Sequence, residues 1–282
     1  MHRVIAFTVG LFILSGVAAA APKSFTVEVS GKGAPVILIP GLACGGKVWD
    51  STVARYRQGH ELHVLTLAGF AGTPAAADGP LLPAVKTELA AYIREHKLHK
   101  PIVIGHSLGG FVALWLAASE PELLGPVVLV DSMPFFAATF DAHATPESVR
   151  PRAEIMRQML VSATPEGFAA QNRMALATMI TDPKNIEPIA EMGKTTSQKA
   201  AAQAMYDMMT TDLRPLLPKV RVPVLVIAAG QGEPTADTAK QYEAQFATLP
   251  GHRVVVAEKA RHFIMLDDPQ FLFAQLDGVV QK

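Results

Sequence analysis

Short apolar runs alternate with helix-length segments along most of this 282-residue chain. The apolar runs occupy residues 36–39, 62–67, 102–104, 127–130, 224–228 and 254–257. The helix-length segments occupy residues 46–58, 82–95, 110–119, 235–249 and 268–280. Buried-type strands that alternate with helices predict an α/β fold, with a mostly parallel central sheet and helices on both faces. Sheets of this kind bind ligands at the carboxyl ends of their strands.

One stretch interrupts the alternation. Residues 134–213 have no convincing strand pattern, and they contain proline-separated helical segments and eight of the eleven methionines. We therefore expect a helical cap at residues 134–213, inserted into an α/β core formed by residues 21–133 and 214–282.

The first twenty residues are typical of an export signal. They comprise a short basic end at residues 1–3, an apolar stretch at residues 4–17 and three alanines at residues 18–20. Cleavage after Ala20 would give a periplasmic or secreted mature protein. The apolar stretch is short for a bilayer span and no other segment approaches that length, so we expect no stable membrane insertion after signal removal.

The charge balance disfavours a polyanionic partner. The chain has 25 basic and 25 acidic residues and no basic run longer than a pair. A nucleic-acid or anionic-membrane partner normally requires a basic patch, so we expect a small-molecule substrate and no nucleic acid. The single cysteine, Cys44, permits no internal disulfide. The oligomeric state stays open.

The segment Gly105-His106-Ser107-Leu108-Gly109 lies between an apolar run and a helix-forming run. A serine at the apex of a sharp strand-to-helix turn holds a strained backbone, and only glycine-sized residues fit two positions before and after it. The turn lifts the Ser107 hydroxyl clear of the sheet and directs the N-terminus of the following helix toward a developing oxyanion. This context favours a nucleophile over an inert serine in a glycine-rich turn.

A serine hydroxyl needs a base within hydrogen-bond reach and donors for the oxyanion. His262 is the candidate base, because it follows the last apolar run and precedes the final helix. His106, inside the turn, is expected to pack beside the nucleophile. The expected oxyanion donors are the backbone N–H groups of Leu108, which starts the helix, and of Leu42, in the loop after residues 36–39.

The other histidines do not indicate a metal centre. His96 and His99 have helical spacing, but Lys97 and Lys100 beside them and the lack of a third ligand favour a solvated helix end. We expect neither a metal nor a cofactor.

In chain order these features resemble the α/β-hydrolase superfamily. Pro40-Gly41-Leu42 follows a strand, Gly-His-Ser-Leu-Gly-Gly spans residues 105–110, a helical insertion follows, and His262 precedes Asp-Asp-Pro at residues 267–269. The resemblance covers nearly the whole mature chain and implies a serine hydrolase. Many members carry His-Gly where this chain has Pro-Gly, but the oxyanion donor is the next backbone N–H. A serine at the turn separates the chain from the superfamily's haloalkane dehalogenases and epoxide hydrolases.

The resemblance leaves the catalytic acid open. Most members place it after the strand corresponding to residues 224–228. This chain lacks an aspartate at the usual position there, and the acidic residues that follow the strand are Glu233 and then Asp237. A minority place it at the end of the preceding strand, which here is Asp131. A carboxylate in that position is costly to bury without a partner, which favours Asp131, with Glu233 and then Asp237 as alternatives. Asp131 also has an ordinary interpretation, as a cap of the turn at residues 132–134.

The cap composition bears on the substrate. Flexible methionines make either an adaptable apolar wall over Ser107 or ordinary core filling. The residues concerned are Met156, Met159, Met174, Met179, Met205, Met208 and Met209, with Phe135, Phe136 and Phe140 close to the active edge. We predict a carboxylic ester hydrolase that acts through an acyl-enzyme on a small uncharged apolar ester. The alternatives are an amidase or aminopeptidase, an acyltransferase or a cofactor-free perhydrolase of the same fold, and a slow or non-catalytic ligand-binding homologue.

Overall fold

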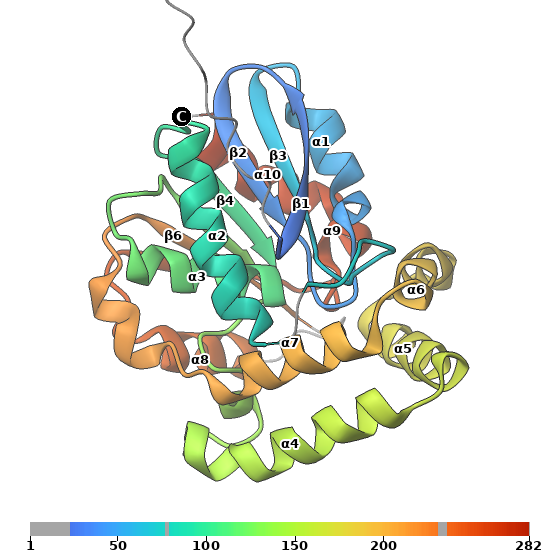
Figure 1. Ribbon diagram of the computed structural model, residues 1–282. Coiled ribbons are helices and arrows are strands. Elements are labelled where there is room, and N and C mark those ends of the chain that lie inside the picture. The colour runs from blue at the N-terminus through green and yellow to red at the C-terminus, as the bar shows by residue number, and fades with distance from the viewer. Residues whose placement is uncertain (1–22, 77–78, 231–235, 282) are drawn as a thin grey trace, which may run out of the picture.

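A computed structural model describes residues 23–76, 79–230 and 236–281 (Figure 1). The expected export signal at residues 1–20 and Glu233 lie outside these ranges. The strands of the sheet are β1 Phe25–Gly31, β2 Ala34–Ile39, β3 His60–Leu67, β4 Ile102–His106, β5 Val127–Val130, β6 Val224–Ala229 and β7 His252–Ala257.

The strands form one sheet in the order β1-β3-β2-β4-β5-β6-β7. Only β1 runs antiparallel to its neighbour β3, and every other neighbouring pair is parallel. The prediction of a mostly parallel α/β sheet is therefore confirmed. The strand order also places the carboxyl ends of β2, β4, β5, β6 and β7 along one edge.

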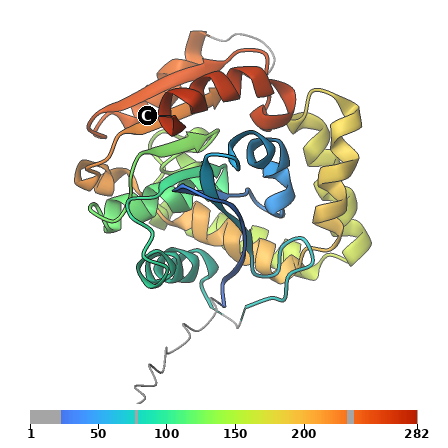
Figure 2. The same ribbon diagram turned by 90° about the horizontal axis from the view of Figure 1, so that it is seen from above.

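Helices cover both faces of this sheet (Figure 2). The helices are α1 Asp50–Tyr56, α2 Leu81–Glu95, α3 Leu108–Ser119, α4 Pro146–Ser162, α5 Pro165–Met179, α6 Ile186–Lys194, α7 Gln198–Thr210, α8 Ala236–Phe246, α9 Ile264–Asp267 and α10 Pro269–Val280. Residues of α2, α3 and α8 share one apolar core, and residues of α1, α9 and α10 share the other. Successive strand residues alternate between the two cores, as Ile37 and Leu38 do.

Several helix boundaries differ from the sequence expectation, and α8 ends at Phe246 rather than at residue 249. Residues 46–58 divide into a short 3₁₀ helix, Gly46–Trp49, followed by α1. The helix expected at residues 110–119 begins at Leu108, because close packing of the turn around Ser107 fixes two glycines that are weak helix formers by themselves. Within the described residues, no helix combines the length and apolarity needed to cross a bilayer.

Residues 134–213, all of them described, form helices between β5 and β6 and contain no strand. Figure 1 shows α4 to α7 gathered beyond the carboxyl edge of the sheet. Side-chain caps begin three of these helices: Thr145 for α4, Thr164 for α5 and Ser197 for α7. Buried Asp207 of α7 accepts hydrogen bonds from the backbone N–H groups of Leu81 and Leu82, so the insertion also caps a core helix.

Candidate active site

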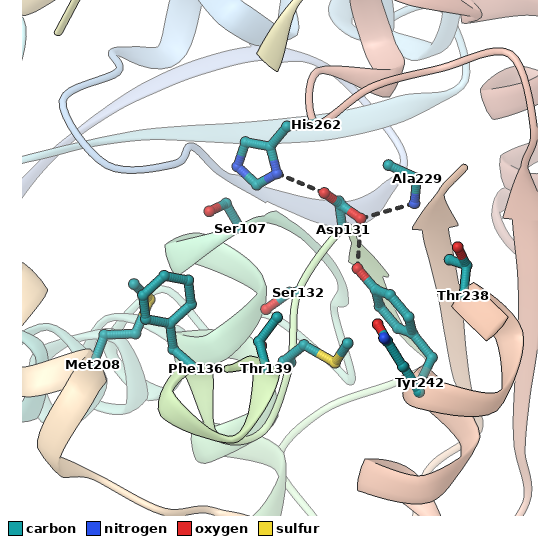
Figure 3. A pocket seen from close by; sticks show the side chains of 12 residues that line it. Ser107, Asp131, Ser132, Phe136, Thr139, Met208, Ala229, Thr238, Tyr242 and His262 are labelled. Carbon is teal, nitrogen blue, oxygen red and sulfur yellow. Dashed lines mark hydrogen bonds and ion pairs between the residues drawn. The ribbon is translucent and has the colours of Figure 1, made fainter. Parts of the chain in front are cut away.

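Three side chains from separate strand ends face one cavity at the carboxyl edge of the sheet (Figure 3). Ser107 follows β4, Asp131 follows β5 and His262 lies in the loop after β7. All three line a cavity of about 190 Å³. The parallel strand order thus brings together Ser107 and His262, which are 155 positions apart in the sequence.

The backbone of Ser107 is strained in the way the glycine spacing predicts. Its φ of 52° and ψ of −119° lie in a region that side-chain-bearing residues rarely adopt. A Cβ on Gly105 would lie 2.3 Å from the carbonyl carbon of Gly109, and a Cβ on Gly109 would lie 2.3 Å from Ile39 O. The two glycines are therefore required by backbone packing, and the turn that they permit presents the Ser107 hydroxyl to the cavity.

The two carboxylate oxygens of Asp131 have different partners. Oδ2 lies 2.5 Å from Nδ1 of His262. Oδ1 accepts hydrogen bonds from the Ala229 backbone N–H at 2.8 Å and from the Tyr242 hydroxyl at 2.5 Å. Burial by itself raises the pKa of Asp131, but the hydrogen bond and the charge attraction of His262, with the hydrogen bonds from Tyr242 and Ala229, outweigh it, so the pKa lies below its usual value. The buried carboxylate is therefore ionised and paired.

His262 is oriented from two sides. An ionised carboxylate only accepts hydrogen bonds, so Nδ1 of His262 carries the proton, and Nε2 keeps its lone pair. On the other side, Nε2 of His106 donates to the backbone carbonyl of His262 at 3.0 Å. The rings of His106 and His262 pack with centroids 4.6 Å apart. Among the described residues, no hydrogen bond yet joins Ser107 Oγ to His262.

His106 packs beside the nucleophile rather than facing it as a base. Burial, with a smaller contribution from the neighbouring His262, lowers the pKa of His106 to about 3. The ring is therefore neutral at physiological pH. Since its Nε2–H is used by the His262 carbonyl, its role in this arrangement is to hold the loop that carries His262.

The loop after β2 lies directly against the turn that carries Ser107. A Cβ on Gly41 would lie 3.4 Å from Cβ of Ser107, so Gly41 packs against the turn immediately before Leu42. Leu108 begins α3 and follows Ser107 immediately. Within the described chain, neither the Leu42 N–H nor the Leu108 N–H is used by a backbone acceptor outside its own element. Both N–H groups therefore stay candidate donors for an oxyanion.

The alternative acids occupy different positions. Asp237 is on α8 with 78% of its side chain exposed, and it pairs with Lys240 rather than with His262. Glu233 lies outside the described residues. Two groups that sequence reasoning missed are the Ala229 N–H and the Tyr242 hydroxyl. The pattern of residues 236–246 indicates that Tyr242 is on a helix, but no motif marks its contact with a strand end.

A second and larger cavity, of about 410 Å³, lies between the insertion and the loop after β2. Its apolar walls come from α4, α5 and α7, with Leu42 and Ala43 at the core side. Four of the seven methionines considered as an apolar wall or as core filling line one of the two cavities. Met208 lines the Ser107 cavity, and Met156, Met159 and Met205 line the larger one.

The remaining apolar candidates have other surroundings. Met209 is buried, whereas Met174 and Met179 are exposed and form no wall over Ser107. Phe136 lines the Ser107 cavity, Phe135 is buried beside it in the chain, and Phe140 is 74% exposed. In the described part of the chain, no three acidic, histidine or cysteine side chains are grouped as metal ligands.

The chain matches the model of the alpha/beta hydrolase family over residues 36–275. It is 30% identical over 252 residues to a pimeloyl-[acyl-carrier protein] methyl ester esterase of Aeromonas hydrophila, covering 88% of this chain and 95% of the relative. It is 27% identical over 271 residues to an N-formylmaleamate deformylase of Pseudomonas putida, covering 93% of this chain and 95% of the relative.

Solved structures share the same fold. An enol-lactonase from Burkholderia xenovorans superposes with a TM-score of 0.75 at 20% identity, over 94% of this chain and 99% of the other. An esterase from Exiguobacterium antarcticum superposes with a TM-score of 0.76 at 17% identity, over 92% of this chain and 96% of the other.

Proposed function

This chain belongs to the alpha/beta hydrolase family, and from that membership and the geometry of its site we propose a carboxylic ester hydrolase that acts through an acyl-enzyme on Ser107. The observation that carries the proposal is the hydrogen bond between Asp131 Oδ2 and His262 Nδ1, at 2.5 Å, in the cavity that Ser107 also lines. A nucleophile, a base and an acid that orients the base are thereby present in one place.

In the first step, Ser107 Oγ attacks the ester carbonyl carbon while Nε2 of His262 accepts the hydroxyl proton. The carbonyl oxygen becomes an oxyanion, which the N–H groups of Leu42 and Leu108 stabilise. Asp131 holds the proton on Nδ1, so Nε2 is free to act as the base. The negative charge of Asp131 also stabilises the imidazolium that forms on His262.

In the second step, the bond between the carbonyl carbon and the alcohol oxygen breaks, and His262 returns its proton to the leaving alcohol. Water then attacks the acyl group on Ser107, with His262 again accepting a proton. The bond between the acyl carbon and Ser107 Oγ then breaks, His262 returns its proton to Oγ, and the carboxylic acid leaves. Every proton in this cycle passes through Nε2 of one residue, which therefore needs a fixed orientation.

The two cavities favour an uncharged and largely apolar substrate. Among the described residues that line them, none is lysine or arginine, and Asp131 is already paired. The larger cavity begins at Leu42, beside the proposed oxyanion site, and its walls are mostly apolar. We propose that residues 134–213 act as a cap, with an apolar arm of the ester lying between α4 and α5.

Filling this larger cavity should shorten the range of accepted esters. Ala175 lines this cavity from α5. Ala175→Phe should lower kcat/KM for p-nitrophenyl octanoate by at least about tenfold, because one methylene more or less in an apolar pocket changes kcat/KM by about 10-fold or more. Hydrolysis of p-nitrophenyl acetate should change little. Ala170→Phe, exposed on the same helix, is the matched control. Equal losses for both esters would contradict this placement of the substrate.

We also propose export, with the enzyme acting in the periplasm or outside the cell. The supporting pattern is the basic end, apolar stretch and alanine triplet of residues 1–20. Mass spectrometry of protein recovered from outside the cytoplasm should find a new N-terminus at Ala21. Recovery of the full-length chain in the membrane fraction would instead indicate an uncleaved anchor.

A further inference from the structure

Tyr242 occupies a position that the proposed mechanism does not yet use. It lies on α8, on the opposite side of Asp131 from His262 (Figure 3). Tyr242 is buried, with 8% of its surface exposed, and its hydroxyl lies 2.5 Å from Oδ1 of Asp131. It also lines the Ser107 cavity. One hydroxyl thus joins a peripheral helix to the proposed catalytic acid.

We propose that Tyr242 is a positioning residue of the reaction, which fixes the Asp131 carboxylate and sets how strongly that carboxylate attracts the His262 proton. The inference rests on the proposed function, in which Asp131 is the acid that orients His262. Tyr242 touches neither the reacting atoms of Ser107 nor His262 in the described structure, so its effect must pass through Asp131.

The two oxygens of the Asp131 carboxylate have separate roles. Oδ1 accepts from Tyr242 and from the Ala229 N–H, and Oδ2 is left for His262. Asp131 itself has a φ of 48°, in the left-handed region, so its side chain leaves the strand end from an uncommon backbone conformation. Two fixed donors on Oδ1 prevent rotation of the carboxylate and keep Oδ2 in line with the imidazole. The backbone donor alone would leave that rotation less restricted.

The same hydrogen bond has an electrostatic effect. A donor to a carboxylate stabilises its charge and makes the carboxylate less basic. The Tyr242 hydroxyl therefore weakens the attraction of Asp131 for the proton on His262. Among the described residues, the other titratable group facing this pair is His106, from β4, which is neutral at physiological pH. Burial, followed by the charge of Asp131, holds the pKa of Tyr242 well above its usual value, so its hydroxyl keeps its proton.

The test is Tyr242→Phe, which removes one oxygen and keeps the ring. We expect kcat for p-nitrophenyl acetate to fall by about tenfold, because the carboxylate loses one of the two hydrogen bonds that fix Oδ1, and a hydrogen bond to a charged group contributes more than one between neutral groups. The acid limb of the kcat/KM profile should move to higher pH by roughly half a unit, because a more basic Asp131 favours the imidazolium. The downfield proton resonance of His262 Nδ1–H should shift with it.

Tyr56→Phe is the matched control. Tyr56 is also a buried tyrosine whose hydroxyl bonds an aspartate, Asp277 Oδ1, at 2.7 Å, but it lies in the core on the other face of the sheet. This control should lose a similar amount of thermal stability with no change in the pH profile. If Tyr242→Phe leaves both kcat and the acid limb unchanged, or behaves like Tyr56→Phe, Tyr242 is a structural residue only and the inference is overturned.

Combining Tyr242→Phe with Asp131→Asn separates failure of the inference from failure of the proposed function. If Tyr242 acts through Asp131, its replacement should change kcat by less than about twofold once Asp131→Asn is present, since residues that act as a unit are non-additive. An additive loss would contradict the inference alone. A mild effect of Asp131→Asn by itself would instead remove Asp131 from the mechanism, and the proposed function would need another acid.

Discussion

Replacing Ser107 with alanine should lower kcat for ester hydrolysis by about 10⁴ to 10⁶, the range found when a catalytic triad loses one of its members. The thermal midpoint should change little, because the Ser107 backbone N–H bonds Val130 O at 2.9 Å and the Ser107 carbonyl accepts from Phe111 N–H at 3.0 Å whichever side chain is present. Initial rates on p-nitrophenyl acetate and a thermal melt give both quantities.

Ser119→Ala provides the control for this variant. Ser119 is at the other end of α3, exposed to solvent, and should retain full activity. If Ser107→Ala kept more than about a tenth of the wild-type kcat, the loss would be far below that of a nucleophile and the site would have to be reassigned.

Asp131→Asn should lower kcat by about 10⁴, through the imidazole tautomer rather than through binding. Tyr242 and Ala229 both donate to one oxygen of this side chain, so asparagine will place its carbonyl oxygen there. Its NH₂ group then faces Nδ1 of His262 and makes that nitrogen an acceptor. The proton moves to Nε2, and the base can no longer receive the Ser107 proton.

Two further variants make the Asp131 result specific. Asp237→Asn should be mild, because Asp237 is exposed and pairs with Lys240. Glu233→Gln should also be mild if Asp131 is the acid. A large loss with Glu233→Gln and a small one with Asp131→Asn would move the acid to the later loop and leave Asp131 as a turn residue.

Much of the fold and of the site could be predicted from the sequence, because local steric requirements determine which residues can occupy these positions. The strands β2, β5 and β6 are apolar throughout, and β4 is apolar over its first three residues, because helices cover both faces; such runs are visible without a structure. The turn at Ser107 was equally accessible, because its strain demands glycines at fixed offsets. The position of Asp131 at a strand end also suggested burial with a partner, and the structure supplies three donors.

Long-range side-chain contacts could not be predicted from the sequence in this way. Tyr242 meets Asp131 across 111 residues of sequence, and only the packing of α8 against the sheet brings them together. The methionines show the same limit. Their number indicated an apolar insertion, but whether each one lines the Ser107 cavity, lines the larger cavity or faces solvent depends on how α4 to α7 are rotated against one another.

Direct observation of the covalent intermediate tests the central claim most sharply. The folded protein should react with a fluorophosphonate in a one-to-one ratio, and fragmentation of the labelled peptide should place the adduct on Ser107. Prior unfolding should abolish the reaction, because a serine hydroxyl is a weak nucleophile without its base. An adduct on another residue, or no adduct on active protein, would contradict an acyl-enzyme mechanism at Ser107.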